Sequence, residues 1–200
     1  MLMNNNETIK LQRILNLLTY FQSDSNVRML HRKFKRKSIT DIYGVARKEL
    51  QHSNFLAWLL DPYESHGLGA YALERFLLLV ARRGMLQKNN DKGFSSVKND
   101  LLLLQLNVSN VSIVTEYNVN GGRIDILVEN IQIGDKTVNL IIENKVDSKE
   151  HDGQTSTYYN EINKRFHNSE NIYIFLTPKS SKVLDTLSKP SCDCKKFIEI

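Results

Sequence analysis

The stretch VNLIIENKV, residues 138–146, has the pattern of a buried β-strand whose last residues carry charge. Its apolar run at 140–142 predicts a strand in the core, with Ile141 on one face and its two neighbours on the other. Glu143 and Lys145 follow at a spacing of two, so both side chains project from the same face. The stretch therefore predicts a core strand that delivers a carboxylate and an ammonium to one edge of a sheet.

Two further strands are predicted before this one and form an antiparallel meander with it. Residues 111–119 alternate between apolar and polar side chains, as a strand does. The NGG sequence at 120–122 favours a tight hairpin turn, because Asn and Gly tolerate positive φ. Residues 123–130 form the second strand, and IGDK at 133–136 supplies the turn into the third. Branched apolar residues mark one face of the second strand: Ile124, Ile126 and Val128.

A helix and another buried strand are predicted after the meander. Residues 150–166 have helical spacing, and residues 171–178 are nearly all apolar. The last residues, FIEI at 197–200, begin a further strand that the chain barely enters. An antiparallel meander, a crossover helix and a buried strand predict an α/β fold with a central mixed β-sheet flanked by helices.

The first half of the chain is predicted to be helical. Amphipathic spacing predicts helices over residues 7–22, from about residue 41 to Asp61, and over 67–83. Residues 87–100 have a turn-forming composition and predict a loop. These helices are expected to pack on the sheet.

The positive charge of the protein is concentrated in residues 28–37. The net charge is +5, and this segment holds six Lys or Arg and no acid, so the remainder has a net charge of −1. Such a patch suits an arm that binds a polyanion, although a solvated connector has the same composition. The predicted organisation is a helix with a basic linker over 1–40 and the sheet domain over 41–200. The candidates for phosphate contacts are Arg32, Lys33, Lys35, Arg36 and Lys37.

Length and composition exclude several classes of protein. Two hundred residues suit one domain with a sizeable core. No apolar run approaches the length of a membrane span, and the N-terminus lacks the apolar core of a signal peptide. Cys192 and Cys194 form a lone Cys-x-Cys, which is neither a zinc motif nor a disulfide framework. Reduced thiols and a cytoplasmic location are therefore expected.

Asp125 lies opposite the isoleucine face of its strand. Pairing through the turn at 133–136 brings it beside Glu143 and Lys145, and two converging carboxylates repel each other unless a cation neutralises them. Oxygen ligands of this kind suit Mg²⁺ or Mn²⁺. The alternative is a salt bridge of Lys145 with either carboxylate on a solvated face, worth less than about 1 kcal/mol. Spacing alone does not distinguish the two.

Several motifs together resemble one family. GGRID, IIENK and DGQTSTYY resemble the core of the PD-(D/E)XK nuclease superfamily. The upstream segment KELQHSNFLAWLLDPYESHGLG resembles the bacterial and phage members that begin with a Glu-x-x-His-Ser-x-Phe-Leu-x-Trp-Leu-Leu-Asp-Pro segment. The resemblance runs over about residues 47–178 and implies a restriction-endonuclease-like core. Members hydrolyse phosphodiesters in DNA, and less often in RNA, by attack of a metal-activated water.

The resemblance also implies roles for individual residues. Asp125 and Glu143 would bind Mg²⁺ or Mn²⁺, and the backbone carbonyl of Asn144 would complete the ligand set. Lys145 would be the catalytic lysine, which orients the nucleophile or stabilises developing charge. An acidic residue of the early helix often reaches the metal in this superfamily, so Glu49 is an additional candidate ligand.

Alternatives remain open for the flanking residues. Glu49 lies on a helical stripe with Ile42, Val45, His52, Leu56 and Leu59. If the helix broke at His52 and Ser53, Glu49 would only bond the local backbone. Gln154 begins the core-facing stripe of the later helix, and the resemblance implies that it positions metal or phosphate. Tyr158, one turn later, suits either the site or the core.

Two residues of the first strands complete the candidates. Arg123 shares a face with Asp125 and is expected to bind phosphate or to pair with a carboxylate. Glu116 either supports the site electrostatically or is an exposed residue of its strand, and the second is expected.

The expected function is that of a metal-dependent DNA endonuclease of a kind associated with defence against phage. An inactive nucleic-acid- or protein-binding module on the same fold, and an RNase, are the alternatives. The chain stops as its last strand begins, whereas relatives usually continue with more sheet and helix. A truncated product or closure by a partner chain or a second copy is therefore expected.

Overall fold

The computed structural model describes residues 5–27, 29, 43–44, 48–103, 106–146, 153–177 and 192–200. The chain divides into two compact units, Met1–Ala46 and Arg47–Ile200. In the first unit α1 (Asn5–Ser23) is the helix that the spacing over residues 7–22 predicts. The predicted phosphate contacts Arg32, Lys33, Lys35, Arg36 and Lys37 lie outside the described residues.

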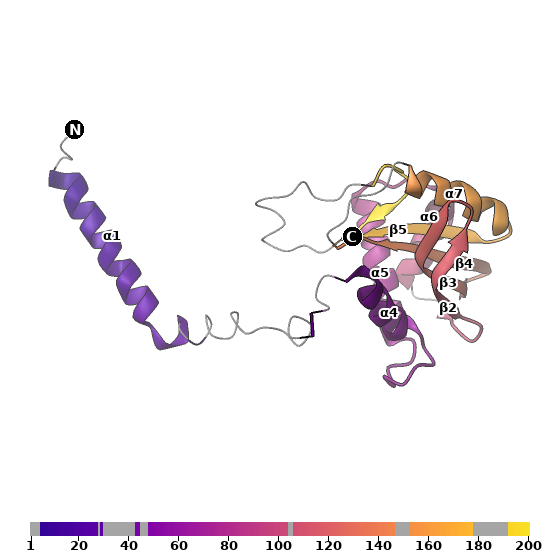
Figure 1. Ribbon diagram of the computed structural model, residues 1–200, viewed down its shortest axis with the longest axis horizontal. Coiled ribbons are helices and arrows are strands. Elements are labelled where there is room, and N and C mark those ends of the chain that lie inside the picture. Colours follow the sequence, from indigo (N-terminus) through magenta and orange to yellow (C-terminus); the bar gives the residue numbers. More distant parts are fainter. Residues whose placement is uncertain are drawn as a thin grey trace. The chain divides into compact units, whose positions relative to one another are not determined.

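A six-stranded mixed sheet forms the centre of the second unit (Figure 1). Its strands are β1 (Leu106–Asn107), β2 (Ser112–Val119), β3 (Gly122–Ile133), β4 (Lys136–Asn144), β5 (Glu170–Leu176) and β6 (Ile198–Glu199). The predicted antiparallel meander is formed by β2, β3 and β4, and β1 extends the pairing along β3. The crossover helix α7 (Gln154–Arg165) joins β4 to its parallel neighbour β5, and β6 adds in parallel beyond β5. The predicted mixed sheet is confirmed.

Helices cover both faces of this sheet. One face packs against α4 (Glu49–Leu60), α5 (Tyr71–Leu86) and α6 (Lys92–Leu103), and the other against α7 (Figure 1). Residues of β4 divide between the two cores as the alternation predicts, Ile141 with α7 and its two neighbours with the other helices. In the described part of the chain, none of the helices combines the length and apolar content needed to cross a membrane.

The prediction of a loop over residues 87–100 is wrong, because α6 occupies most of it. Polar residues begin the segment, but Phe94, Val97 and Leu101 form a helical stripe that is buried in the core. Asp91 starts the helix, since its Oδ2 accepts the N–H groups of Gly93 at 2.9 Å and Phe94 at 3.4 Å. A side chain at Gly93 would overlap the backbone of β5, so this glycine permits close packing of helix on strand.

The predicted start of the helix from about residue 41 to Asp61 is wrong, because α4 begins only at Glu49, Lys48 before it has extended backbone, and Tyr43 and Gly44 lie in a turn. Helix α4 continues through His52 and Ser53, so the break that was considered there does not occur. The buried face contains Ser53, Ala57 and Leu60, whereas His52 is exposed. The predicted stripe through His52 is therefore wrong, and its first members Ile42 and Val45 lie outside the described residues.

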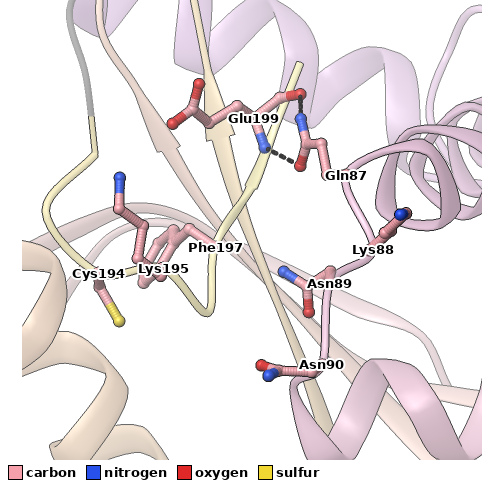
Figure 2. A pocket seen from close by; sticks show the side chains of 8 residues that line it. All are labelled: Gln87, Lys88, Asn89, Asn90, Cys194, Lys195, Phe197 and Glu199. Carbon is pink, nitrogen blue, oxygen red and sulfur yellow. Dashed lines mark hydrogen bonds between the residues drawn. The ribbon is translucent and has the colours of Figure 1, made fainter.

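Gln87 closes the outer edge of β6 (Figure 2). Its side-chain amide donates to the carbonyl of Glu199 at 2.6 Å and accepts the N–H of the same residue at 3.0 Å. A neighbouring strand would make the same two hydrogen bonds, so the side chain of Gln87 takes the place of a further strand at this edge. The pocket of about 380 Å³ in Figure 2 lies beside this contact and contains none of the predicted site residues.

Candidate metal and catalytic site

The carboxyl-terminal end of β4 lies beside the start of β3. Ile126 pairs with Ile142 in the antiparallel ladder, so Asp125, one residue earlier in β3, lies beside Glu143, one residue later in β4. The Oδ2 atom of Asp125 accepts the backbone N–H of Asn144 at 2.7 Å. The predicted approach of the two carboxylate-bearing strands is therefore present.

Glu143 and Lys145 form a buried ion pair. Lys145 Nζ lies 2.7 Å from Glu143 Oε1, and the two side chains are 9% and 1% exposed. The backbone N–H of Lys145 donates to the carbonyl of Leu176 on β5, which holds this end of the strand in the sheet. A salt bridge does form, but it does not lie on a solvated face. Removing the two charged groups from water is therefore costly unless further hydrogen-bond partners stabilise them.

Helix α4 holds the end of β4 from one face of the sheet. Glu49 Oε1 accepts the backbone N–H of Val146 at 2.9 Å, so Glu49 bonds a residue distant in sequence. The side chain of Asn144 donates to Ser53 Oγ at 3.1 Å and to the carbonyl of Glu49 at 3.4 Å. The sequence analysis did not identify Ser53. Its signal was a small polar residue one turn after Glu49, at the start of the stripe that continues with Ala57 and Leu60.

Helix α7 reaches the site from the other face. Gln154 Nε2 donates to Glu143 Oε1 at 3.1 Å and to the hydroxyl of Tyr158 at 2.5 Å. That hydroxyl donates to the carbonyl of Arg123 at 2.8 Å. Tyr158 is thus both a buried core residue and a link between α7 and the site. A side chain at Gly122 would lie 2.6 Å from the hydroxyl, so the glycine lets the hairpin approach.

Glu116 has an unusual backbone opposite the site. Its φ of 55° is left-handed, which costs a residue with a side chain about 1–2 kcal/mol. The residues on either side of it pair with Ile124 and Ile126, so Glu116 lies opposite Asp125. At this point β3 changes face, since Ile126 and Val128 pack with α4 to α6 and Ile124 packs with α7. The prediction that these three share one face is therefore wrong.

Arg123 pairs with Glu116, at 2.8 Å between Nη1 and Oε2. The Arg123 side chain is 64% exposed and that of Glu116 only 30%, so Glu116 is not the freely exposed residue that was expected. An ion pair this accessible contributes at most about 1 kcal/mol. Of the two expected roles of Arg123, pairing with a carboxylate is present.

Burial and mutual repulsion raise the pKa values of two acids of the site, Asp125 and Glu143. Burial, and after it the charge of Asp125, raise the pKa of Glu143 to about 7 against the opposing effect of Lys145. Burial likewise raises the pKa of Asp125, despite the hydrogen bond from Asn144. Burial disfavours the Lys145 ammonium, but Glu143, Asp125 and Glu49 outweigh it and its pKa is raised. Lys145 is therefore a permanent cation at neutral pH.

The residues present fit a divalent cation. Glu49, Asp125 and Glu143, here called the carboxylate cluster, exceed the charge of Lys145 by two when all three are ionised, which a bound cation favours. Glu143 Oε2 and Gln154 Oε1 are buried, and no hydrogen-bond donor of the described residues reaches either oxygen. An unpaired buried acceptor is costly, and a hard cation satisfies such oxygens. Among the described residues, no group of three or more His, Cys, Asp or Glu side chains lies close enough together to hold a metal ion by itself. Mg²⁺ itself needs only one or two carboxylates with water.

Comparison with known proteins identifies the family. A family model described as the PD-(D/E)XK nuclease superfamily matches residues 39–192, which is more than half of the chain. The matched segment contains α4, the meander and α7, and with them the whole carboxylate cluster. No curated protein and no solved structure matches the chain.

Proposed function

The chain belongs to the PD-(D/E)XK nuclease superfamily, and we propose that it is a metal-dependent endonuclease that hydrolyses phosphodiester bonds in DNA. One observation carries the proposal. Acceptor oxygens that no donor of the described residues reaches lie in a buried acidic site beside a lysine that stays charged. A binding module that had lost turnover would have no need to keep this costly arrangement.

Each residue of the site has a proposed role. Asp125 and Glu143 hold Mg²⁺ or Mn²⁺ together with the backbone carbonyl of Asn144, and Glu49 adds negative charge next to them. The bound metal supplies a water of lowered pKa and neutralises phosphate charge. The Lys145 ammonium lies beside Glu143, where it orients the nucleophile and stabilises charge that develops on the phosphate.

The flanking residues support this arrangement. Gln154 fixes Glu143 through its amide nitrogen, and Tyr158 fixes Gln154 in turn. Ser53 fixes the side chain of Asn144 from the opposite face, so the strand end is held between two helices. Supporting contacts of this kind keep catalytic groups within the narrow geometry that catalysis needs.

DNA is the proposed substrate and the cytoplasm the proposed location. Arg123 is exposed beside the carboxylate cluster, and the basic segment 28–37 is proposed to add phosphate contacts that weaken with salt. Neither Cys192 nor Cys194 forms a disulfide with a described residue, which suits a reducing compartment.

The test is incubation of the purified protein with plasmid DNA, linear DNA and RNA, each with and without Mg²⁺ or Mn²⁺. The proposal predicts nicking or linearisation of the plasmid only with metal, and no cleavage by Lys145→Ala. Arg82→Ala, an exposed cation on α5, is the matched control and should cleave like the wild type. Absence of metal-dependent cleavage, or equal cleavage by Lys145→Ala, would overturn the proposal. Cleavage of RNA alone would identify an RNase.

A further inference from the structure

A polar groove of about 430 Å³ lies beside the β2–β3 hairpin, outside the site described above. One wall is the end of β2 with the turn that follows, and the other is the carboxyl-terminal half of α7. Its lining residues are Asn118, Val119, Asn120, Glu161, Lys164 and Arg165.

Both walls of the groove are held in place by packing. A side chain at Gly121 would lie 3.2 Å from the methyl group of Thr157, so the turn rests directly on α7. Further along, the guanidinium of Arg165 lies 5.0 Å from the ring centre of Tyr117, whose ring also packs near Phe166. The groove is therefore formed in the folded protein without any rearrangement.

The lining has the charge that an anionic ligand needs. Glu161 is the acidic residue of the lining. It forms an ion pair with Lys164 and accepts a hydrogen bond from the side-chain amide of Asn120, both at 3.1 Å. Arg165 is exposed and forms no ion pair with any residue that the structure describes. The lining therefore presents a net positive charge, and Asn118 and Asn120 add exposed amides next to it.

Strand pairing and hydrogen bonds link the hairpin wall of the groove to the carboxylate cluster. Asn118 pairs with Arg123 across the hairpin, and the Arg123 carbonyl connects through Tyr158 and Gln154 to Glu143. Lys164 lies ten residues after Gln154 on α7, which is about 15 Å at the rise of an α-helix. That distance equals about four to five nucleotides at the 3.4 Å rise of one strand of B-form DNA.

We propose that this groove binds the phosphate backbone of the substrate about four to five nucleotides from the scissile bond. The strand then runs from the carboxylate cluster over Arg123 to Lys164 and Arg165. This inference rests on the proposed function. Cations in the last turn of a helix also stabilise its dipole, and that effect alone predicts a small change in stability without a change in nucleic-acid binding.

The test measures binding of a fluorescein-labelled DNA duplex by anisotropy in EDTA, across a range of salt concentrations. The variant is Lys164→Ala/Arg165→Ala in the full chain. The matched control is Arg75→Ala/Arg82→Ala, which removes two exposed cations from α5 on the other face of the sheet. The proposal predicts that the first variant binds about 10-fold more weakly at 0.1 M salt. Its slope of log affinity against log salt should fall by about 1.8, as expected for two lost phosphate contacts.

The outcomes separate this inference from the proposed function, because binding is measured without metal. If the first variant and the control bind equally, or the wild type does not bind DNA, the groove proposal is overturned even when the enzyme cleaves. If the first variant alone weakens binding while the wild type never cleaves, the groove stands and the nuclease proposal fails. Circular dichroism melting of both variants shows that a loss of binding is not a loss of fold.

Discussion

Two buried polar clusters lie on the α7 side of β4, four residues apart. At the start of the strand Asn139 accepts the N–H of Asn130 at 3.1 Å and donates to Asn171 at 3.0 Å. Asn171 donates in turn to Asn163 at 3.2 Å and to the carbonyl of Phe166 at 3.1 Å. At the end of the strand Glu143 and Gln154 each keep an oxygen that no described donor reaches. One cluster is neutral and complete, and the other is charged and incomplete.

The difference shows how a structural polar network is distinguished from a functional one. The asparagine ladder, defined as Asn130, Asn139, Asn163 and Asn171, joins a bulge of β3 to α7 with its amides paired inside the protein. Paired amides stabilise the fold and have nothing left to bind. The carboxylate cluster has acids that repel one another and oxygens that no described donor reaches, and a cation is able to bind both.

The largest effect is expected from a change in the carboxylate cluster. Lys145→Ala removes the fixed cation beside Glu143, and we expect kcat for DNA cleavage to fall by about 10²–10³-fold or more. Asn139→Ala alters the ladder and should leave kcat within about twofold of the wild type, because it lies outside the site. Steady-state cleavage with Mg²⁺ measures both. Similar losses in the two variants would show that the clusters do not differ in function.

The second prediction concerns pH and stability without metal. Glu143 has a pKa of about 7 in the folded protein and an ordinary value of 4.5 when unfolded. The folded state therefore keeps a proton that the unfolded state releases, and the free energy of unfolding falls as pH rises from about 4.5 to 7. The free energy of unfolding falls by a few kcal/mol at most, which is about the free energy that corresponds to the shift in the pKa of Glu143.

Glu143→Gln isolates this contribution, because the amide does not titrate. Urea unfolding at a series of pH values should give the wild type a steeper decline than the variant between pH 4.5 and 7. Addition of Mg²⁺ or Mn²⁺ should flatten the wild-type decline, since a bound cation favours the carboxylate. Parallel curves for the two proteins would argue against the buried, metal-free carboxylate described above.

The third prediction concerns the contribution of the asparagine ladder to stability. Asn139→Ala leaves the Asn130 N–H and one acceptor of Asn171 without their partner, which should cost about 1–3 kcal/mol. The melting temperature should then fall by about 2–4 °C for each kcal/mol. Gln132→Ala, which loses only a half-buried contact with Thr137, is the control and should change stability less. An equal effect of both changes would remove the case for a structural role of the ladder.

The smallest expected effect tests the link between α7 and the site. Tyr158→Phe removes the hydroxyl that bonds Gln154 and the Arg123 carbonyl, and we expect kcat to fall by up to about 10-fold. Tyr159→Phe is the matched control on the next position of the same helix, where the hydroxyl bonds Asp91. That variant should lose stability by about 1 kcal/mol and keep its activity. Activity loss in Tyr159→Phe but not Tyr158→Phe would contradict the assignment.

The order and type of most elements followed from local pattern. The alternation over 138–146 and the turn at 120–122 correctly predicted β4 and its hairpin neighbours, because strand periodicity is a property of consecutive residues. The same reasoning failed at residues 87–100, where a polar start concealed the buried stripe of α6. It also failed at Ile124, where the left-handed backbone of Glu116 on the neighbouring strand coincides with a change of face.

The sequence by itself determined that Glu143 and Lys145 share a face and that Asp125 approaches them, since the spacing of two and the hairpin register specify both. Only the tertiary structure decided how the site is completed. Glu49 on α4 bonds Val146 just after β4, and the open oxygens of Glu143 and Gln154 depend on which donors of the described residues do not reach them. Periodicity is encoded locally, whereas burial, partner identity and pKa depend on contacts between residues far apart in the chain. The sequence therefore predicted the charged end of VNLIIENKV. Only the fold showed that the carboxylates gathered there outnumber the neighbouring cation.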